Sequence, residues 1–246
     1  MTLPTLHVLT LNIHKGFSSF NRRFVLRDLR DALHTTQADI IFLQEVTGSN
    51  RRKSSQHADW QEPQHLFLAD ALDVEAVYGK NAVHRYGHYG NAILSRFPIL
   101  RWENIDISAH PSEKRGMLHS EIAVPGIDQP VHAFCVHLGL LKPFRRKQYL
   151  WIRHYISTHL PPEAPVIVAG DFNDWNCEAD HHLAQPLNLV EVSKDLHGRH
   201  ARTFPSFYPA LQLDRIYLKG LIATELMVHR QDRWSDHAAL SSRIRL

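Results

Sequence analysis

The stretch PVIVAGDFNDW, residues 165–175, joins an apolar run to a group of polar side chains. The run from Pro165 to Ala169 predicts a short buried strand. Asp171 and Asn173 follow it, and in an extended segment residues i and i+2 point to the same side. We therefore expect their carboxylate and amide to face one small space, although Gly170 and Asp171 would also suit a simple turn.

Length and composition narrow the class of protein. The chain has 246 residues, 43% of them apolar, so a sizeable core is expected and disorder is not. The net charge of +3 permits a polyanionic substrate without requiring one. Cys135 and Cys177 lack metal-type spacing and are expected to be reduced thiols. The N-terminus, MTLPTLHVLTLNIHKG, is typical of a first strand and not of a signal peptide, and no apolar run is long enough to span a bilayer. We expect a cytoplasmic protein.

Hydrophobic periodicity predicts many strands and few helices. We expect residues 47–64 to form a polar, basic loop and residues 170–212 to be rich in loops. With no linker or repeat, the pattern favours one α/β domain, residues 1–246, built on packed sheets. The predicted strands cover residues 6–13, 39–46, 91–95, 99–107, 118–124, 131–137, 165–169, 214–218, 222–229 and 238–245, and the predicted helices cover 21–36 and 144–159.

The predicted strands repeatedly end next to a residue that can bind a metal ion or a phosphate. Taken singly, such a glutamate is usually a solvated loop residue, such a histidine is usually structural, and Asp214 has Arg215 or Arg202 as a surface partner. Six segments of the chain repeat this arrangement, and the repetition is stronger evidence for a site than any one of these residues. The residues at these positions are Asn12, Glu45, His137, Asp171 with Asn173, Asp214, and the Ser235-Asp236-His237 run.

Eight short motifs in these segments resemble the endonuclease/exonuclease/phosphatase (DNase I-like) superfamily, and most of all its small stand-alone bacterial members. The resemblance implies an α/β fold, a four-layer α/β/β/α sandwich of two mixed β-sheets with outer helices. It extends from residue 8 to residue 245. The motifs, in chain order, are TLNIHKG, LQEV, GNAILSR, KRGMLHSEI, VHLGL, GDFND, LDRIY and SDH.

The resemblance also implies a metal-dependent phosphoric ester hydrolase that uses an activated water. Mg²⁺ prefers oxygen ligands and is usually held by one or two carboxylates, and Mn²⁺ accepts the same ligands. By resemblance Glu45 is the first metal ligand, Asp236 the second, and Asn12 lies nearby through its side-chain oxygen or through water. The histidines form no zinc motif, so a dedicated zinc site is not expected.

The remaining motif residues are implied to act on the phosphate. Asp171 and Asn173 would hold the attacking water and a phosphate oxygen. His237 would contact the phosphate or act as the base, oriented by Asp214, and whether Asp171 or His237 is the base stays open.

Three further side chains would assist these groups. His137 would stabilise the oxyanion or protonate the leaving group. Arg115 would bind phosphate through its forked donors, and Asn91 would support the site by hydrogen bonds.

The sequence indicates the type of reaction more clearly than it indicates the substrate. His137 stands where apurinic endonucleases carry a proline-asparagine turn, which lowers the case for a dedicated abasic-site enzyme. Our first expectation is an endo- or exonuclease on DNA or RNA, and the alternative is a phosphodiesterase or phosphatase on a phospholipid or small organic phosphate. An inactive binding module is a third hypothesis, against which Glu45, Asp171 and His237 are all present.

Two basic stretches and several aromatic residues are candidates for binding a nucleic-acid backbone, its bases or a lipid interface. Solvated faces and ordinary packing are the simpler explanations for them. No obligate protein partner is expected, and the protein is expected to be a monomer. The stretches are Arg51-Arg52-Lys53 and the cations of 142–147, and the aromatic residues are Trp60, Trp175 and those of 204–209.

Overall fold

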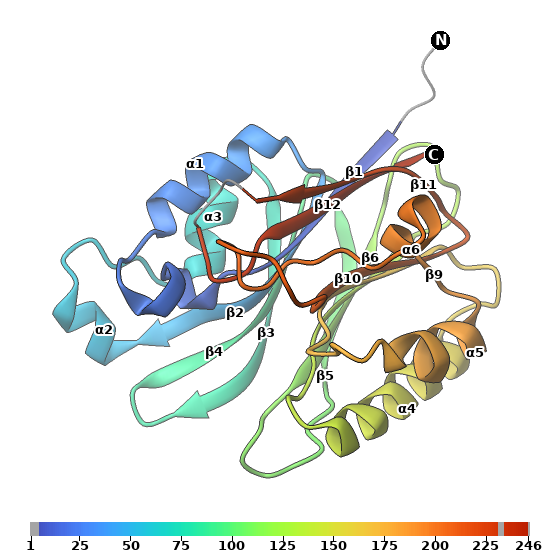
Figure 1. Cartoon of the computed structure of the whole chain (residues 1–246). Helices are drawn as coiled ribbons and strands as arrows, with labels where there is room; N and C mark the ends of the chain where they lie inside the picture. The colour runs from blue at the N-terminus through green and yellow to red at the C-terminus, as the bar shows by residue number, and fades with distance from the viewer. Residues whose placement is uncertain (1–4, 231–233, 246) are drawn as a thin grey trace.

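Two six-stranded β-sheets pack face to face in the computed structural model, which describes residues 5–230 and 234–245 (Figure 1). The first sheet has the order β11-β12-β1-β2-β4-β3, and the second has the order β5-β6-β7-β8-β10-β9. Each is mixed, because β1–β2 and β7–β8 are parallel pairs and their neighbours are antiparallel. The strands of the first sheet are β1 (Thr5–Asn12), β2 (Ile40–Asn50), β3 (Glu75–His84), β4 (Gly87–Ser95), β11 (Ile222–His229) and β12 (Ala239–Arg245). Those of the second are β5 (Ile99–Asp106), β6 (Gly116–Ile122), β7 (Val131–His137), β8 (Val166–Asp171), β9 (Val190–Glu191) and β10 (Asp214–Lys219).

Helices cover the outer faces of both sheets, as Figure 1 shows. On the first sheet, α1 (Leu26–Thr36) and α3 (Gln64–Leu72) pack against each other and share an apolar cluster with β1 and β2. On the second, α4 (Lys142–His159) turns Tyr149, Ile152 and Ile156 inward at helical spacing. The shorter helical segments are η1 (His14–Gly16), η2 (Ser19–Asn21), α2 (Arg51–Gln56), η3 (Asp180–Ala184), α5 (Gln185–Leu187) and α6 (Val192–His197).

An apolar core lies between the two sheets. Phe42 and Ile93 of the first sheet belong to the same buried cluster as Leu118 and Ile167 of the second. With outer helices on both sides, this core confirms the α/β/β/α sandwich that the resemblance implied. No helix among residues 5–230 and 234–245 is both long enough and apolar enough to cross a membrane.

The predicted elements are found, but several bounds were wrong. Residues 47–64 are not one loop, because β2 continues to Asn50 and α2 follows it. The continuation is explained by pairing with β4, in which Thr47 lies opposite Tyr89 and Asn50 lies opposite Gly87. The hydrogen bonds of this pairing satisfy the backbone N–H and C=O groups of a stretch whose side chains are polar.

Two further differences concern helices. The predicted helix 21–36 begins only at Leu26, since the preceding η2 turn holds Phe20 in a left-handed conformation that interrupts helical propagation. The region 170–212 contains η3, α5 and α6, whereas the sequence predicted mainly loops there.

Candidate active site

The polar residues at the strand ends gather where the two sheets meet. Asn12 ends β1, and Glu45 lies in β2 of the same sheet. His137 ends β7 and Asp171 ends β8 in the second sheet, and the amide of Asn12 donates a 3.1 Å hydrogen bond across to Asp171 Oδ2. The site is therefore shared between the sheets.

Gly170 explains how Asp171 reaches this position. It has φ of +147°, and a Cβ there would lie 1.9 Å from the carbonyl oxygen of Val136 on the neighbouring strand. Only glycine allows that approach of β7 to β8. The strand therefore delivers Asp171 with its side chain 1% exposed, facing the partner sheet.

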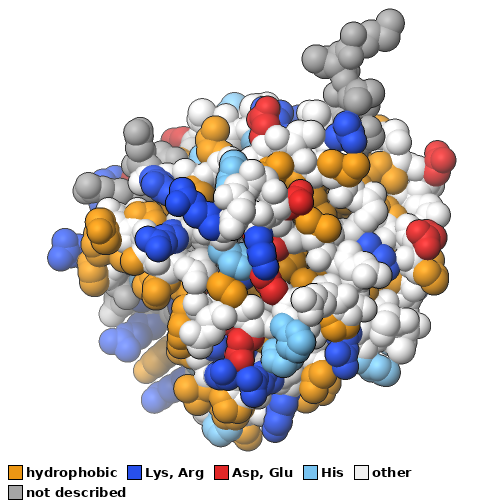
Figure 2. Space-filling view, turned by 45° about the vertical axis from the view of Figure 1, so that its right-hand side comes forward, with side chains coloured by type: hydrophobic (Ala, Val, Ile, Leu, Met, Phe, Trp, Pro, Cys, Tyr) orange, Lys and Arg blue, Asp and Glu red, His pale blue; other side chains and the backbone are white. Residues whose placement is uncertain are grey.

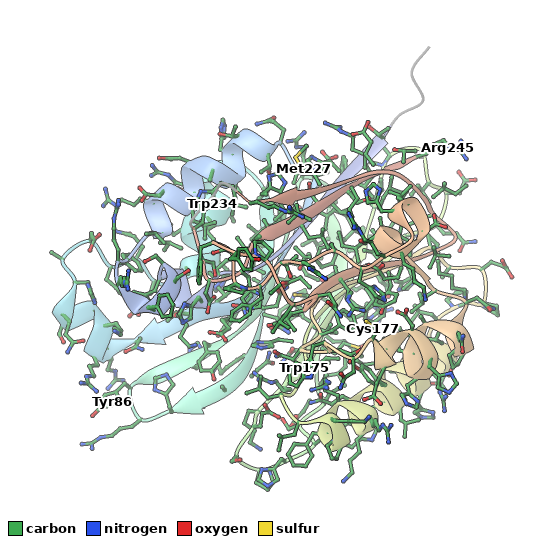
Figure 3. All side chains as sticks on the ribbon, viewed as in Figure 1. Tyr86, Trp175, Cys177, Met227, Trp234 and Arg245 are labelled. Carbon is green, nitrogen blue, oxygen red and sulfur yellow. The ribbon has the colours of Figure 1, made fainter. Side chains whose placement is uncertain are left out.

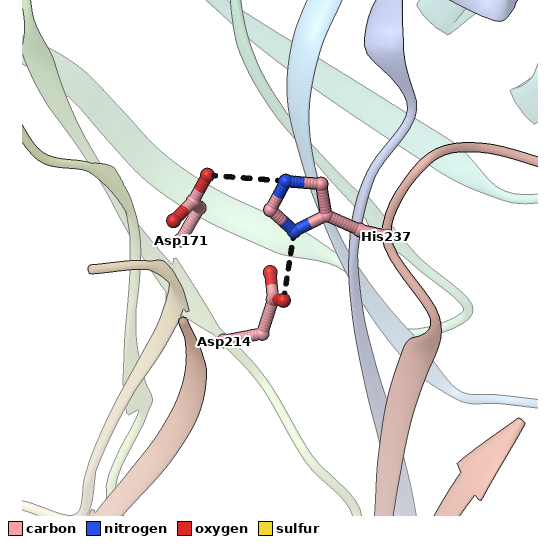
Figure 4. A group of neighbouring side chains, drawn as sticks. All are labelled: Asp171, Asp214 and His237. Carbon is pink, nitrogen blue, oxygen red and sulfur yellow. Dashed lines mark hydrogen bonds and ion pairs between the residues drawn. The ribbon is translucent and has the colours of Figure 1, made fainter. Parts of the chain in front are cut away.

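Asp171, His237 and Asp214 form a connected row of charged groups (Figure 4). His237 Nδ1 lies 2.9 Å from Asp214 Oδ2, and its Nε2 lies 3.8 Å from Asp171 Oδ2. Asp214 Oδ2 also accepts a 2.5 Å hydrogen bond from the hydroxyl of Thr203. The row fixes the imidazole between two carboxylates, with Nε2 directed at Asp171.

Burial and charge set the protonation of this row. Burial raises the pKa of Asp171 to about 6, with Asp214 adding to the rise and His237 opposing it. Burial alone would lower the pKa of His237, but the two carboxylates raise it to about 10. At neutral pH, Asp171 is therefore a carboxylate able to accept a proton, and His237 is a cation.

His137 and Asn173 border Asp171 on its other side. His137 Nε2 lies 3.5 Å from Asp171 Oδ2, and burial together with Arg115 holds the pKa of His137 well below its usual value. The backbone N–H of Asn173 donates to Asp171 Oδ1 at 2.9 Å, and its amide donates to Leu138 O.

We expected strand alternation to place the side chains of Asp171 and Asn173 on the same side, and this reason was wrong. Asn173 has φ of 48°, so the chain is no longer extended there, and strand alternation does not relate the two side chains. They are instead joined by a turn in which the carboxylate accepts a backbone N–H two residues later.

Glu45 is paired with Lys15, whose ammonium contacts Glu45 Oε2. Burial opposes ionisation of Glu45, but Lys15 and His137 outweigh it and lower its pKa to about 2. Glu45, Lys15 and His14 all have positive φ, as Asn173 does. Non-glycine residues in that region store strain of about 1–3 kcal/mol each and cluster at functional sites.

Asp236 completes the first sheet's contribution. Its Oδ2 lies 3.6 Å from His14 Nδ1, and its Oδ1 lies 3.1 Å from the hydroxyl oxygen of Ser235. The same hydroxyl donates to the backbone carbonyl of Asn12 at 2.6 Å, which ties the Ser235–His237 segment to the end of β1.

Asp171, Asp214 and His237 form one group of side chains that could hold a divalent cation. Ligand atoms of Asp171, Asp214 and His237 lie within 4.8 Å of one another, a spacing that allows metal binding. However, a protonated His237 has no free lone pair, and Asp214 Oδ2 already accepts two hydrogen bonds.

Glu45, Asp236 and Asn12 offer the oxygen donors that a hard cation prefers. Glu45 is ionised and already neutralised by an ammonium, which shows that a positive charge is accommodated there. Asp236 adds a second carboxylate, and Asn12 Oδ1 accepts a hydrogen bond from His14 N that leaves one lone pair.

Arg115 and Asn91 lie beside these groups in different ways. Arg115 is mostly buried, pairs with Glu113 at 3.2 Å and has an unpartnered Nε. The amide of Asn91 donates to Gly116 O and Cys135 O, so this side chain of the first sheet holds strands of the second.

Sequence reasoning missed His14, Lys15 and Thr203. His14 and Lys15 lie within the first motif and Thr203 lies outside all eight, and their contacts join segments that only the fold brings together. Cys135 and Cys177 are free, as expected.

The basic stretch of 142–147 is neither a free phosphate-binding surface nor a fully solvated face. Arg145 is fully buried, where it donates to Gly139 O and Leu140 O and lies 4.9 Å from the ring of Trp175. Figure 3 labels Trp175, on the loop after β8. Lys142 and Arg146 both pair with Glu178, so this stretch offers fewer free cations than its composition indicates. In the view of Figure 2, basic side chains lie in several separate groups and not in one patch.

Comparison with known proteins agrees with this fold. Residues 9–237 match the Endonuclease/Exonuclease/phosphatase family. The chain belongs to this family. Members of the Endonuclease/Exonuclease/phosphatase family are hydrolases that act on phosphoester bonds.

Several individual proteins are similar over the whole chain. Uncharacterized protein YbhP of Escherichia coli strain K12 is 46% identical over 243 residues, which cover 97% of this chain and 96% of YbhP. Among solved structures, an endonuclease/exonuclease/phosphatase from Beutenbergia cavernae has a TM-score of 0.79 at 18% identity and covers 98% of this chain and 72% of its own. D. rerio TDP2, complexed with single strand DNA product, has a TM-score of 0.76 at 20% identity, covering 98% and 99%. At these identities, the solved structures show the shared fold alone.

Proposed function

We propose that this protein is a divalent-metal-dependent phosphodiesterase that hydrolyses nucleic-acid strands by attack of an activated water. The observation that carries the proposal is the buried carboxylate of Asp171, held between the amide of Asn12 and the imidazoles of His137 and His237. Such a carboxylate accepts a proton, and its neighbours can hold a phosphate.

In the proposed reaction, Asp171 is the general base. It takes a proton from the attacking water while the water oxygen bonds to phosphorus and the bond to the leaving ester oxygen breaks. The raised pKa of Asp171 suits a base that works near neutral pH. His237 is already charged by Asp214, which assigns it to binding a phosphate oxygen rather than to removing the proton.

The other site residues position or neutralise charge. The neutral imidazole of His137 donates a hydrogen bond to a phosphate oxygen, and its lowered pKa argues against its acting as the acid. Asn173 fixes the Asp171 carboxylate through its backbone N–H, and Arg115 offers an unpartnered Nε to the phosphate. A cation held by Glu45, Asp236 and Asn12 would supply neutralisation of the phosphate and of the leaving oxygen.

The choice of a nucleic acid rests on the charge balance and on relatives. The chain is mildly basic, and D. rerio TDP2, which shares its fold, was solved with single strand DNA product. Exposed cations bind a phosphate backbone irrespective of its sequence.

The experiment compares purified protein with its Asp171→Asn variant in Mg²⁺ or Mn²⁺, with a chelator control. The substrates are a single-stranded oligonucleotide, a plasmid, phospholipid vesicles and an aryl phosphodiester. We expect oligonucleotide hydrolysis that the chelator abolishes and that Asp171→Asn lowers roughly 10²- to 10⁴-fold. Asp70→Asn, an exposed carboxylate on α3, should retain full activity. Hydrolysis of vesicle lipid with no hydrolysis of any nucleic acid would reject the proposal.

A further inference from the structure

Two phenylalanine rings stand exposed beside the Ser235–His237 segment. Phe20 of η2 is 69% exposed and Phe207 is 57% exposed, and their ring centroids lie 6.0 Å apart at an interplanar angle of 37°. They border a cavity of about 400 Å³ that Ser18, Ser19 and Arg22 also line. Burying such a side chain would stabilise the fold, so leaving both in solvent calls for another explanation.

The backbone holds Phe20 outward under strain. Its φ of 64° and ψ of 21° lie in the left-handed region, where a bulky residue is a true outlier. Such strain persists only where the surrounding structure fixes it, and it is typical of ligand-binding positions. Phe20 gains no burial in return for this conformation.

Both rings are anchored to the segment that carries Asp236 and His237. Ser19, next to Phe20, donates to Ser235 O at 3.4 Å. Ser206, next to Phe207, donates to the same carbonyl through its hydroxyl at 2.7 Å and to Asp236 O through its backbone N–H at 2.7 Å. The two rings, and the cavity that they line, are therefore tied to the segment that carries Asp236 and His237.

The lining of the cavity selects a flat, anionic ligand. The guanidinium of Arg22 lies 5.2 Å from the Phe20 centroid, and no ion pair involves Arg22 among the described residues. Among the residues that the structure describes, no carboxylate lines the cavity. Two aromatic faces suit a planar π-system, and a neighbouring unpaired cation suits a phosphate.

We propose that Phe20 and Phe207 form an exposed aromatic platform on which an unpaired nucleobase stacks, beside the segment that carries Asp236 and His237, which makes single-stranded nucleic acid the preferred substrate. In a duplex, the faces of each base are covered by its neighbours and are not free to stack on such a platform. Arg22 binds a phosphate of the same strand. This inference rests on the proposed function and names the substrate class of that site.

The test measures binding in the Asp171→Asn background, so that turnover does not interfere. Fluorescence anisotropy follows a labelled single-stranded oligonucleotide, the matching duplex and a fully abasic strand of the same length. Phe20→Ala and Phe207→Ala should each weaken binding of the single strand roughly 5- to 150-fold, the equivalent of losing one stacked base. Binding of the abasic strand should not change, because it has no base to stack.

Two further variants separate stacking from general apolar contact and from misfolding. Tyr208→Ala removes a neighbouring ring that is 75% exposed but does not line the cavity, and it should bind like the parent. Phe20→Leu keeps apolar bulk without an aromatic face and should be as weak as Phe20→Ala. A 2-aminopurine placed at successive positions of the strand should be quenched at one position, and the quenching should vanish in Phe20→Ala.

The outcomes distinguish this inference from the proposed function. If wild-type protein hydrolyses single strands but the Phe20 and Phe207 variants bind like Tyr208→Ala, the stacking platform is rejected and the proposed function stands. Full rescue by Phe20→Leu also rejects stacking. If no nucleic acid is hydrolysed and the same variants lose binding to phospholipid vesicles, the proposed function fails and the rings are membrane contacts.

Discussion

Asp171 owes its chemistry to its surroundings, because the same carboxylate in water would titrate near pH 4. Burial raises its pKa to about 6, while Asp214 keeps His237 charged up to about pH 10. The two groups therefore have their required forms, carboxylate and imidazolium, together only between these values.

This difference predicts a pH profile for the reaction. The rate should rise with pH as Asp171 loses its proton near pH 6 and fall again as His237 loses its proton near pH 10. Measuring kcat/KM from pH 4 to pH 10.5 at saturating Mg²⁺ tests it. An activity that is flat from pH 4 to pH 8 would exclude Asp171 as the base.

At this scale, the sequence predicted which residues would converge but not how they touch. Strand-end positions and motif resemblance pointed to Asp171, His237 and Asp214, which the structure brings together. The Thr203 hydroxyl on Asp214 was not predictable, since that contact depends on the path of the chain between them.

At the scale of elements, α3 supports the site through hydrogen bonds of its first residue. Gln64 at its start is fully buried, accepts a 2.8 Å hydrogen bond from Thr47 N in β2 and donates a 2.8 Å hydrogen bond to Lys15 O in η1. It thus links the strand that carries Glu45 with the turn that carries the partner of Glu45.

Replacing Gln64 should therefore destabilise the protein. In Gln64→Leu, two buried backbone groups lose their partners, at a cost of about 1–3 kcal/mol for each group. We expect the free energy of unfolding in urea to fall by about 2–4 kcal/mol. Gln56→Leu on the exposed surface of α2 should change it by less than about 0.5 kcal/mol. Equal effects of the two substitutions would contradict this role of Gln64.

Strands were easier to predict than helices here. Buried strands such as β7 and β8 have short runs of β-branched and apolar residues, and β7 was found with the bounds that we expected. By contrast, α3 and β3 were not predicted, and α2 fell within a stretch that looked like a loop. Their order comes from tertiary contacts, such as those of Gln64, and local sequence does not report these.

At the scale of the molecule, a second charged cluster makes stability depend on pH. His200 lies 3.0 Å from Asp180 and 3.1 Å from Glu191. Burial alone would lower the pKa of His200, but these carboxylates raise it to about 9, and His200 in turn lowers the pKa of Asp180 against the effect of burial.

The pKa shifts of His200 and Asp180 make the free energy of unfolding depend on pH in opposite directions. The contribution of His200 is fully present below its unfolded pKa of about 6.5 and is lost as pH rises through about 9. That of Asp180 is present above about pH 4 and is lost as pH falls. Stability should be greatest between these limits.

We expect His200→Asn to lower the free energy of unfolding at pH 6 by about 2 kcal/mol and to remove much of its decline between pH 6.5 and pH 9. Denaturant titrations at several pH values measure both effects. His34→Asn, an exposed histidine on α1, should keep the wild-type profile. If the decline persisted in His200→Asn, its cause would lie elsewhere.

The sharing of the site between the sheets has a consequence for how activity arises. Asn12, Glu45 and His237 come from one sheet or its flanking segment, and His137, Asp171 and Asp214 come from the other. A chain that has formed only one sheet, whether emerging from the ribosome or partly unfolded, holds half of a reaction centre. Hydrolysis can therefore begin only after the halves dock, so recovery of activity on refolding should be the last signal to appear.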